Sequence, residues 1–133
     1  MENSRLKDIY KNLKQNNFDV YFTGQHKGDC IKPYVVVKPG ITTKHATVSA
    51  LIHYFDILCY VPKDKPSELI EFISKVQKSL LQLSPMIKFN GAIQDSYFDE
   101  SVNGWLADLE YINYSKYDSD VFQKLNISEE INH

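Results

Sequence analysis

The ten residues from 21 to 30, YFTGQHKGDC, place several groups that could do chemistry in one short stretch. Cys30 and His26 could form a nucleophile and its base, because a neighbouring imidazole activates a thiolate. Asp29 adds a third group that could bind a metal ion together with them. Each of these functions needs further partners from elsewhere in the chain.

The partners for a metal site are not close in sequence. Zinc sites usually have four nitrogen or sulfur ligands that come from two closely spaced pairs, and no second Cys/His pair lies near the loop. His45, His53 and Cys59 could still converge in space. We nevertheless predict no metal site, and we expect His53, which lies among apolar residues, to be a hydrogen-bonded histidine of the core or of an interface.

The loop also departs from known catalytic and phosphate-binding motifs. A phosphate-binding loop has the pattern GxxxxGK[ST] before a helix, whereas Gly24 and Gly28 are closer together and precede an expected strand. No oxyanion-hole motif or orienting third group accompanies the Cys30 thiol. We therefore predict no catalytic residue and no cofactor, and we interpret the loop as structural or as a binding surface.

Carboxylates elsewhere do not change this interpretation. Asp108 and Glu110 lie on the same side of an expected strand, and such pairs usually belong to a solvated face. Nothing in the sequence indicates an environment that would raise their pKa. Asp56 lies inside an apolar strand and, if it is buried, needs a basic partner from another element or another chain.

Composition fits one globular domain. The chain has 133 residues, of which 43% are hydrophobic and 24% are charged, and this length can bury a core without disulfides or metals. Cys30 and Cys59 form no CxxC pair. No apolar run approaches about 18 residues, the length of a membrane span, and no apolar signal opens the chain. We therefore expect a soluble protein of a reducing cytosol, with no membrane partner.

Charge is distributed unevenly. The net charge is −2, which argues against a nucleic-acid-binding module. Residues 1–47 carry +4, residues 48–94 carry +1 and residues 95–133 carry −7. A basic first third and an acidic last third would suit head-to-tail assembly, although an uneven solvated surface is the alternative.

Hydrophobic periodicity predicts the elements. Leu6, Ile9 and Leu13 keep helical spacing, with Asn16 and Asn17 as the stop signal. The remaining expected elements are strands over 18–22, 34–38 and 48–61, a helix over 66–83, a strand over 86–94 and a strand over 105–114. Asn90 and Gly91 indicate either a bulge or a hairpin turn within 86–94.

The connections follow from turn-forming residues. Pro39 and Gly40 are expected to end the strand 34–38, so that 41–47 is a loop or the frayed start of the next strand. Residues 96–104 are expected to form a connecting loop. Residues 118–133 form an acidic tail, for which a short helix around 120–125 and a frayed end are the two alternatives.

Together these elements predict an α+β fold in the order α-β-β-β-α-β-β. We expect a mostly antiparallel or mixed sheet of about five strands with two helices packed on it. One domain would span residues 1–117 and the acidic tail would follow it.

Several blocks of the chain resemble a known family. The segments FDVYFTGQHKGDCIKPYVVVK (18–38) and FDILCYVP (55–62), with the later WLADLEYINY (105–114), are similar to small proteins encoded in the tail modules of prophages and phage-tail-like particles of Gram-positive bacteria. The resemblance spans residues 6–117, and the chain departs most from the family pattern in residues 40–50 and after 117. Members of this group are identified as tail terminators, also called tail completion proteins.

The resemblance implies a virion structural protein with no enzymatic activity. It implies a sheet flanked by helices that assembles as a ring, usually six-fold, which caps the tail tube, stops its elongation and offers a surface for joining the head. The implied partners are further copies of the chain, the tail tube protein and the head or neck proteins. The implied location is the bacterial host cytoplasm during assembly and then the mature particle.

The resemblance also implies which residues make contacts. The candidates for contacts with other subunits or with the tube are Gly24, Gln25, His26, Lys27, Gly28, Thr42, Thr43, Lys44 and His45. A head–tail stopper or other neck connector is the nearest alternative role. A small enzyme that uses Cys30 and His26, and a nucleic-acid-binding module, are the alternatives from other classes.

Overall fold

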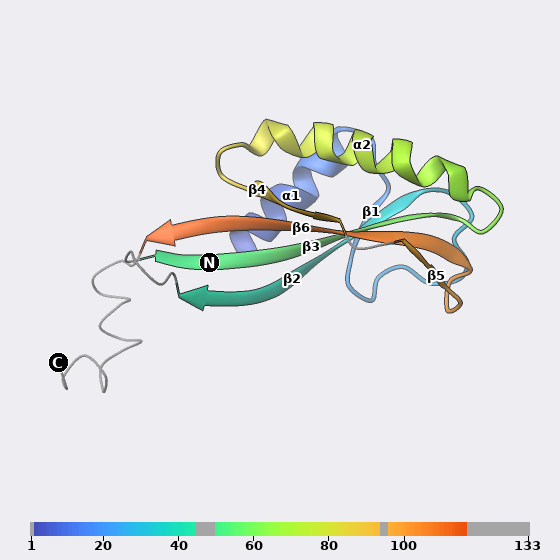
Figure 1. The fold of residues 1–133 in the computed structure, drawn as a ribbon, viewed down its shortest axis with the longest axis horizontal. Coiled ribbons are helices and arrows are strands. Elements are labelled where there is room, and N and C mark those ends of the chain that lie inside the picture. The colour runs from blue at the N-terminus through green and yellow to red at the C-terminus, as the bar shows by residue number, and fades with distance from the viewer. Residues whose placement is uncertain (1, 45–49, 94–95, 117–133) are drawn as a thin grey trace.

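The computed structural model describes residues 2–44, 50–93 and 96–116, and it has an α+β fold in which both helices cover one face of a mixed, six-stranded sheet (Figure 1). The predicted fold class is therefore confirmed. The elements in chain order are α1 (Glu2–Gln15), β1 (Val20–Phe22), β2 (Tyr34–Lys44), β3 (Ala50–Pro62), η1 (Pro66–Glu68), α2 (Leu69–Leu80), η2 (Leu81–Leu83), β4 (Lys88–Ile93), β5 (Tyr97–Asp99) and β6 (Gly104–Lys116).

The strands are arranged in the order β1-β2-β3-β6-β4, and β5 also pairs with β6. β1 is parallel to β2, and every other pair is antiparallel. β3 pairs with β6 over its full length, from Ala50 opposite Lys116 to Pro62 opposite Gly104. The two long strands therefore form the centre of the sheet.

The first helix buries the stripe that the sequence predicts. Leu6, Ile9 and Leu13 are all buried. The helix ends where expected, because Asn17 adopts a left-handed backbone (φ 68°) and the Phe18 amide then donates to the Leu13 carbonyl at 3.0 Å. Asparagine tolerates this conformation better than most residues.

The second helical region begins at Pro66, where a missing amide hydrogen costs nothing. Leu69, Ile73, Val76 and Leu80 face the sheet. The region continues as a 3-10 turn to Leu83, so its predicted extent of 66–83 agrees with the combined η1, α2 and η2.

The two faces of the sheet differ. The face under the helices carries Phe55, Ile57, Cys59, Leu109 and other fully buried side chains that share one core with α1 and α2. The alternating residues point to the opposite face, which we call the open face. A second, smaller cluster lies there, made of Cys30, Tyr34, Tyr60 and Leu106.

The expectation that Pro39 and Gly40 end the second strand is wrong, because β2 continues to Lys44. β1 pairs only with Val35–Val37, so the later half of β2 is an edge where a proline's missing donor does no harm. The register shifts between Pro39 and Thr42, which is a bulge. Glycine fits this bulge, because a Cβ at Gly40 would lie 3.0 Å from the Tyr54 carbonyl oxygen.

The expectation of a plain loop over 96–104 is also wrong. β5 and the start of β6 form a hairpin in which Phe98 pairs with Trp105. Asp99 closes the turn, since its carboxylate accepts hydrogen bonds from the amide and the hydroxyl of Ser101 at 3.0 and 2.6 Å. A strand of three residues is too short to leave a clear period in the sequence.

The stretch 88–93 is one strand with a bulge rather than a hairpin. Phe89 pairs with Tyr111 and Ile93 with Leu109, so three residues on β4 lie between the pairs and one on β6. Gly91 supplies the positive φ of 81° that this irregularity needs. The alternatives left open by Asn90 and Gly91 are thus resolved as a bulge.

Within the described helices, no segment is both long and apolar enough to cross a membrane. The acidic tail predicted for 118–133 lies outside the described residues.

Candidate interaction surface

The loop from 23 to 33 joins two parallel strands and packs on the open face. The His26 ring stacks on Tyr34 with centroids 3.8 Å apart and an interplanar angle of 8°, and Tyr34 stacks in turn on Tyr60 at 4.6 Å. Tyr21 meets the His26 ring edge-on at 5.0 Å. His26 therefore anchors the loop to its own sheet.

The far end of the loop is fixed to the β5–β6 hairpin. The Cys30 amide donates to the Val102 carbonyl at 2.6 Å, and the Asn103 side chain donates to the Asp29 carboxylate at 3.1 Å. Gly104 allows this approach, because a Cβ there would lie 2.8 Å from the Cβ of Cys30. The loop thus fits closely between its own strand β1 and the hairpin.

Cys30 belongs to the small cluster on the open face, which also contains the Tyr34 ring on which His26 stacks. The thiol is 4% exposed and donates to the Lys32 carbonyl at 3.3 Å. Burial raises the pKa of Cys30 to about 11, which keeps the thiol protonated at neutral pH. The described contacts of the His26 ring are with Tyr21 and Tyr34 rather than with this thiol.

The other residues of the predicted contact loop are exposed. Gln25 closes a tight turn, since its side-chain oxygen accepts from the Phe22 amide at 2.8 Å. Gly24 and Gly28 both have φ of 83°, and Lys27 points to solvent. Exposure leaves Gln25 and Lys27 accessible, whereas the predicted contact residue His26 is already half-buried in its stack.

The second predicted contact group lies in the outer half of β2. Thr42 and Lys44 are exposed and Thr43 is half-buried. The Thr42 hydroxyl lies 3.1 Å from Nδ1 of His53, whose Nε2 lies 2.8 Å from the Ser115 hydroxyl. His53 is thus a buried, hydrogen-bonded residue, as expected. His45 lies outside the described residues.

Beyond the loop, the open face is covered by no described helix (Figure 1). Antiparallel register places its side chains in rows across β2, β3 and β6: Lys38 lies opposite Asp56, and Asp56 lies opposite Glu110. Its members are Val36, Lys38, Ile52, Tyr54, Asp56, Leu58, Asp108, Glu110, Ile112 and Tyr114, most of them half-buried, with Tyr114 49% exposed.

Asp108 has an unusual environment on this face. Burial raises its pKa to about 7, helped by a side-chain hydrogen bond and charge repulsion from Asp56, while Lys38 acts in the opposite direction. One carboxyl oxygen of Asp108 is buried and has no hydrogen-bond partner among the described residues. A buried polar atom without a partner costs free energy that an added donor would recover.

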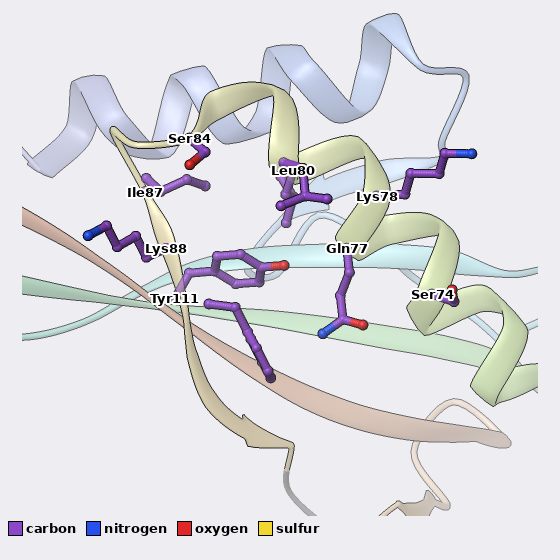
Figure 2. A pocket seen from close by; sticks show the side chains of 10 residues that line it. Ser74, Gln77, Lys78, Leu80, Ser84, Ile87, Lys88 and Tyr111 are labelled. Carbon is purple, nitrogen blue, oxygen red and sulfur yellow. The ribbon is translucent and has the colours of Figure 1, made fainter.

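A groove of about 440 Å³ lies on the other side of the sheet, between α2 and β4 (Figure 2). Leu80, Ile87 and Tyr111 form its apolar interior, and Lys78 and Lys88 lie at its rim. The residues that line the groove include no carboxylate, histidine or cysteine. Across the described residues, no group of three His, Cys, Asp or Glu side chains is arranged to hold a metal ion.

Comparison with known proteins does not assign the chain to a family. No family model matches the sequence, and a search of curated proteins finds no match.

The sequence did not reveal that Asp56 and Asp108 lie close together. Both residues follow the alternation that places them on the open face, but only the register of β3 against β6 brings them together, with Asp108 opposite Leu58 and one row from Asp56. Two isolated acidic residues inside long apolar strands were the signal that could have indicated it.

Proposed function

We propose that the protein is a structural subunit of a phage tail, a tail terminator. Copies of the chain form a ring that caps the tail tube, ends its elongation and offers a surface for joining the head. The protein acts through binding, and no residue is catalytic. It is made in the host cytoplasm and stays in the particle, at the end of the tail nearest the head.

One structural observation carries the proposal beyond the resemblance of the segments 18–38 and 55–62. A sheet face that carries apolar side chains is usually buried against another layer. Here both helices cover one face, and the open face keeps Ile52, Tyr54 and Leu58 only half-buried. A subunit with one such face is suited to packing against a neighbour.

Electron microscopy of particles made without the protein tests this role. The gene is deleted from its prophage or phage, and tail lengths are compared with those of the parent and of a strain that carries the gene in trans. We expect overlong tubes in the deletion strain and normal lengths after complementation. Tails of normal length that fail to join heads would contradict the terminator role and indicate a neck connector.

A further inference from the structure

Within residues 2–44, 50–93 and 96–116, no layer covers the open face, which carries an excess of acidic groups. Asp56, Asp108 and Glu110 lie near one another across β3 and β6, and the basic group beside them is Lys38. The half-buried Ile52 and Tyr54 continue this surface along the sheet. Apolar area combined with unbalanced carboxylates fits a partner that is both elongated and basic.

The first helix has the complementary character. Lys7, Lys11 and Lys14 are exposed and spaced i, i+4 and i+7, so they form one stripe on the side away from the core. Among the described residues, neither Lys7 nor Lys11 makes an ion pair, and Lys14 lies over the ring of Tyr10 at 5.9 Å. Long lysine stems can also cover apolar surface while their ammonium groups reach carboxylates.

We propose that the open face of one subunit is covered by α1 of the next subunit, with the stripe of Lys7, Lys11 and Lys14 set against Asp56, Asp108 and Glu110. This inference rests on the proposed ring and identifies the two surfaces that build it. The neighbour's helix supplies the layer that the sheet lacks, so that each sheet lies between two helical layers.

The arrangement of the subunit supports a head-to-tail contact. The helices and the open face lie on opposite sides of one sheet (Figure 1). A contact between two different surfaces on opposite sides repeats from subunit to subunit, and it gives a ring when the rotation closes. A contact between two open faces would instead bring carboxylates against carboxylates.

Charge reversal of each surface tests the proposal with the full-length protein. The helix variant carries Lys7→Glu, Lys11→Glu and Lys14→Glu, and the sheet variant carries Asp108→Lys and Glu110→Lys. The control carries Lys63→Glu, Lys65→Glu and Lys78→Glu, which reverses three exposed lysines outside α1. Circular dichroism and thermal unfolding check that each variant folds, and sedimentation velocity over a range of concentrations measures assembly.

We expect each reversed variant alone to raise the concentration for half-assembly by about tenfold or more, since attraction becomes repulsion. The control should assemble like the wild type. An equimolar mixture of the helix and sheet variants should assemble again, because the acidic helix then meets the basic sheet and the basic helix meets the acidic sheet. If the sheet variant does not fold, Asp108→Asn with Glu110→Gln should still weaken assembly.

Two other outcomes separate this inference from the proposed function. A wild-type ring that neither reversed variant disturbs, or variants that fail to rescue each other, would overturn the assignment of surfaces and leave the ring itself standing. A wild-type chain that stays monomeric at every concentration and never binds tail tubes would contradict the proposed function, and the inference with it.

Discussion

Both cysteines are buried, at 4% and 0% exposure. Burial raises the pKa of Cys30 to about 11 and that of Cys59 above its usual range. Because the thiolate is the reactive form, we expect the native protein at pH 7.5 to react with a thiol reagent at least about tenfold more slowly than the unfolded protein. Absorbance after mixing with a chromogenic disulfide measures both rates.

Substitution of Cys30 distinguishes a protein that acts by binding from an enzyme. Cys30→Ser retains a similar side-chain volume, and it should restore normal tails to the deletion strain if the protein acts by assembly alone. A folded Cys30→Ser protein that failed to complement would favour the enzyme alternative.

Asp108 should make the stability of the fold depend on pH. Its pKa is raised from 3.8 to about 7 in the folded state, so the folded protein holds a proton that the unfolded chain releases between these values. The free energy of unfolding therefore falls as pH rises from about 4 to about 7 and levels off above. One pKa unit corresponds to about 1.36 kcal/mol, but partial exposure screens the effect, and we expect on the order of 1–2 kcal/mol.

Urea unfolding at a series of pH values measures this dependence, and Asp108→Asn is the matched control. The amide cannot ionise, so the variant should lack this fall and gain stability relative to the wild type as pH increases. Parallel curves for the two proteins would contradict the assignment. The groups that face Asp108 and could alter the profile are Asp56, Lys38 and Glu110.

At the scale of elements, the stack of His26 on Tyr34 is one of the contacts that hold the loop from 23 to 33 on the sheet. His26→Ala removes the stack on Tyr34, and aromatic pairs contribute about 0.5–1.5 kcal/mol. We expect faster hydrogen exchange at the Cys30 amide, which donates to the Val102 carbonyl. His26→Phe is the control, since it keeps the stack and removes a ring nitrogen, Nδ1, that is buried without a described partner.

The close contact between this loop and the β5–β6 hairpin requires glycine, which has no side chain, at position 104. Gly104→Ala would place a Cβ 2.8 Å from the Cβ of Cys30 and 3.2 Å from the Val61 carbonyl oxygen. Overpacking of this kind costs about 1–3 kcal/mol. The midpoint of urea unfolding should fall accordingly, whereas Glu100→Ala on the exposed turn should leave it nearly unchanged. Equal stability of both variants would show that the hairpin can move away.

At the scale of the whole molecule, assembly through the open face and α1 should be sensitive to salt. The Debye length falls from about 14 Å at 0.05 M to about 3 Å at 1 M ionic strength. We expect the assembled fraction, measured by light scattering after gel filtration, to fall as sodium chloride is raised over this range. An oligomer that persists unchanged at 1 M salt would indicate an apolar interface instead.

The sequence alone determined that the first helix and the two central strands are long regular elements. Leu6, Ile9 and Leu13 keep the helical period. The turn-free alternation over 48–61 and 105–114 indicates long strands, because an element that buries one side repeats its apolar residues at a fixed spacing. The short β5 and the extension of β2 past Pro39 show no such spacing in the sequence.

Only the tertiary structure decided which side chains meet. β1 is parallel to β2, so the loop from 23 to 33 that joins them crosses the open face. There His26 stacks on Tyr34 and Cys30 is buried. The register of β3 against β6 brings Asp56 beside Asp108, where it adds to the burial that raises the pKa of Asp108. Such contacts depend on strand order and register, and local periodicity carries no information about either.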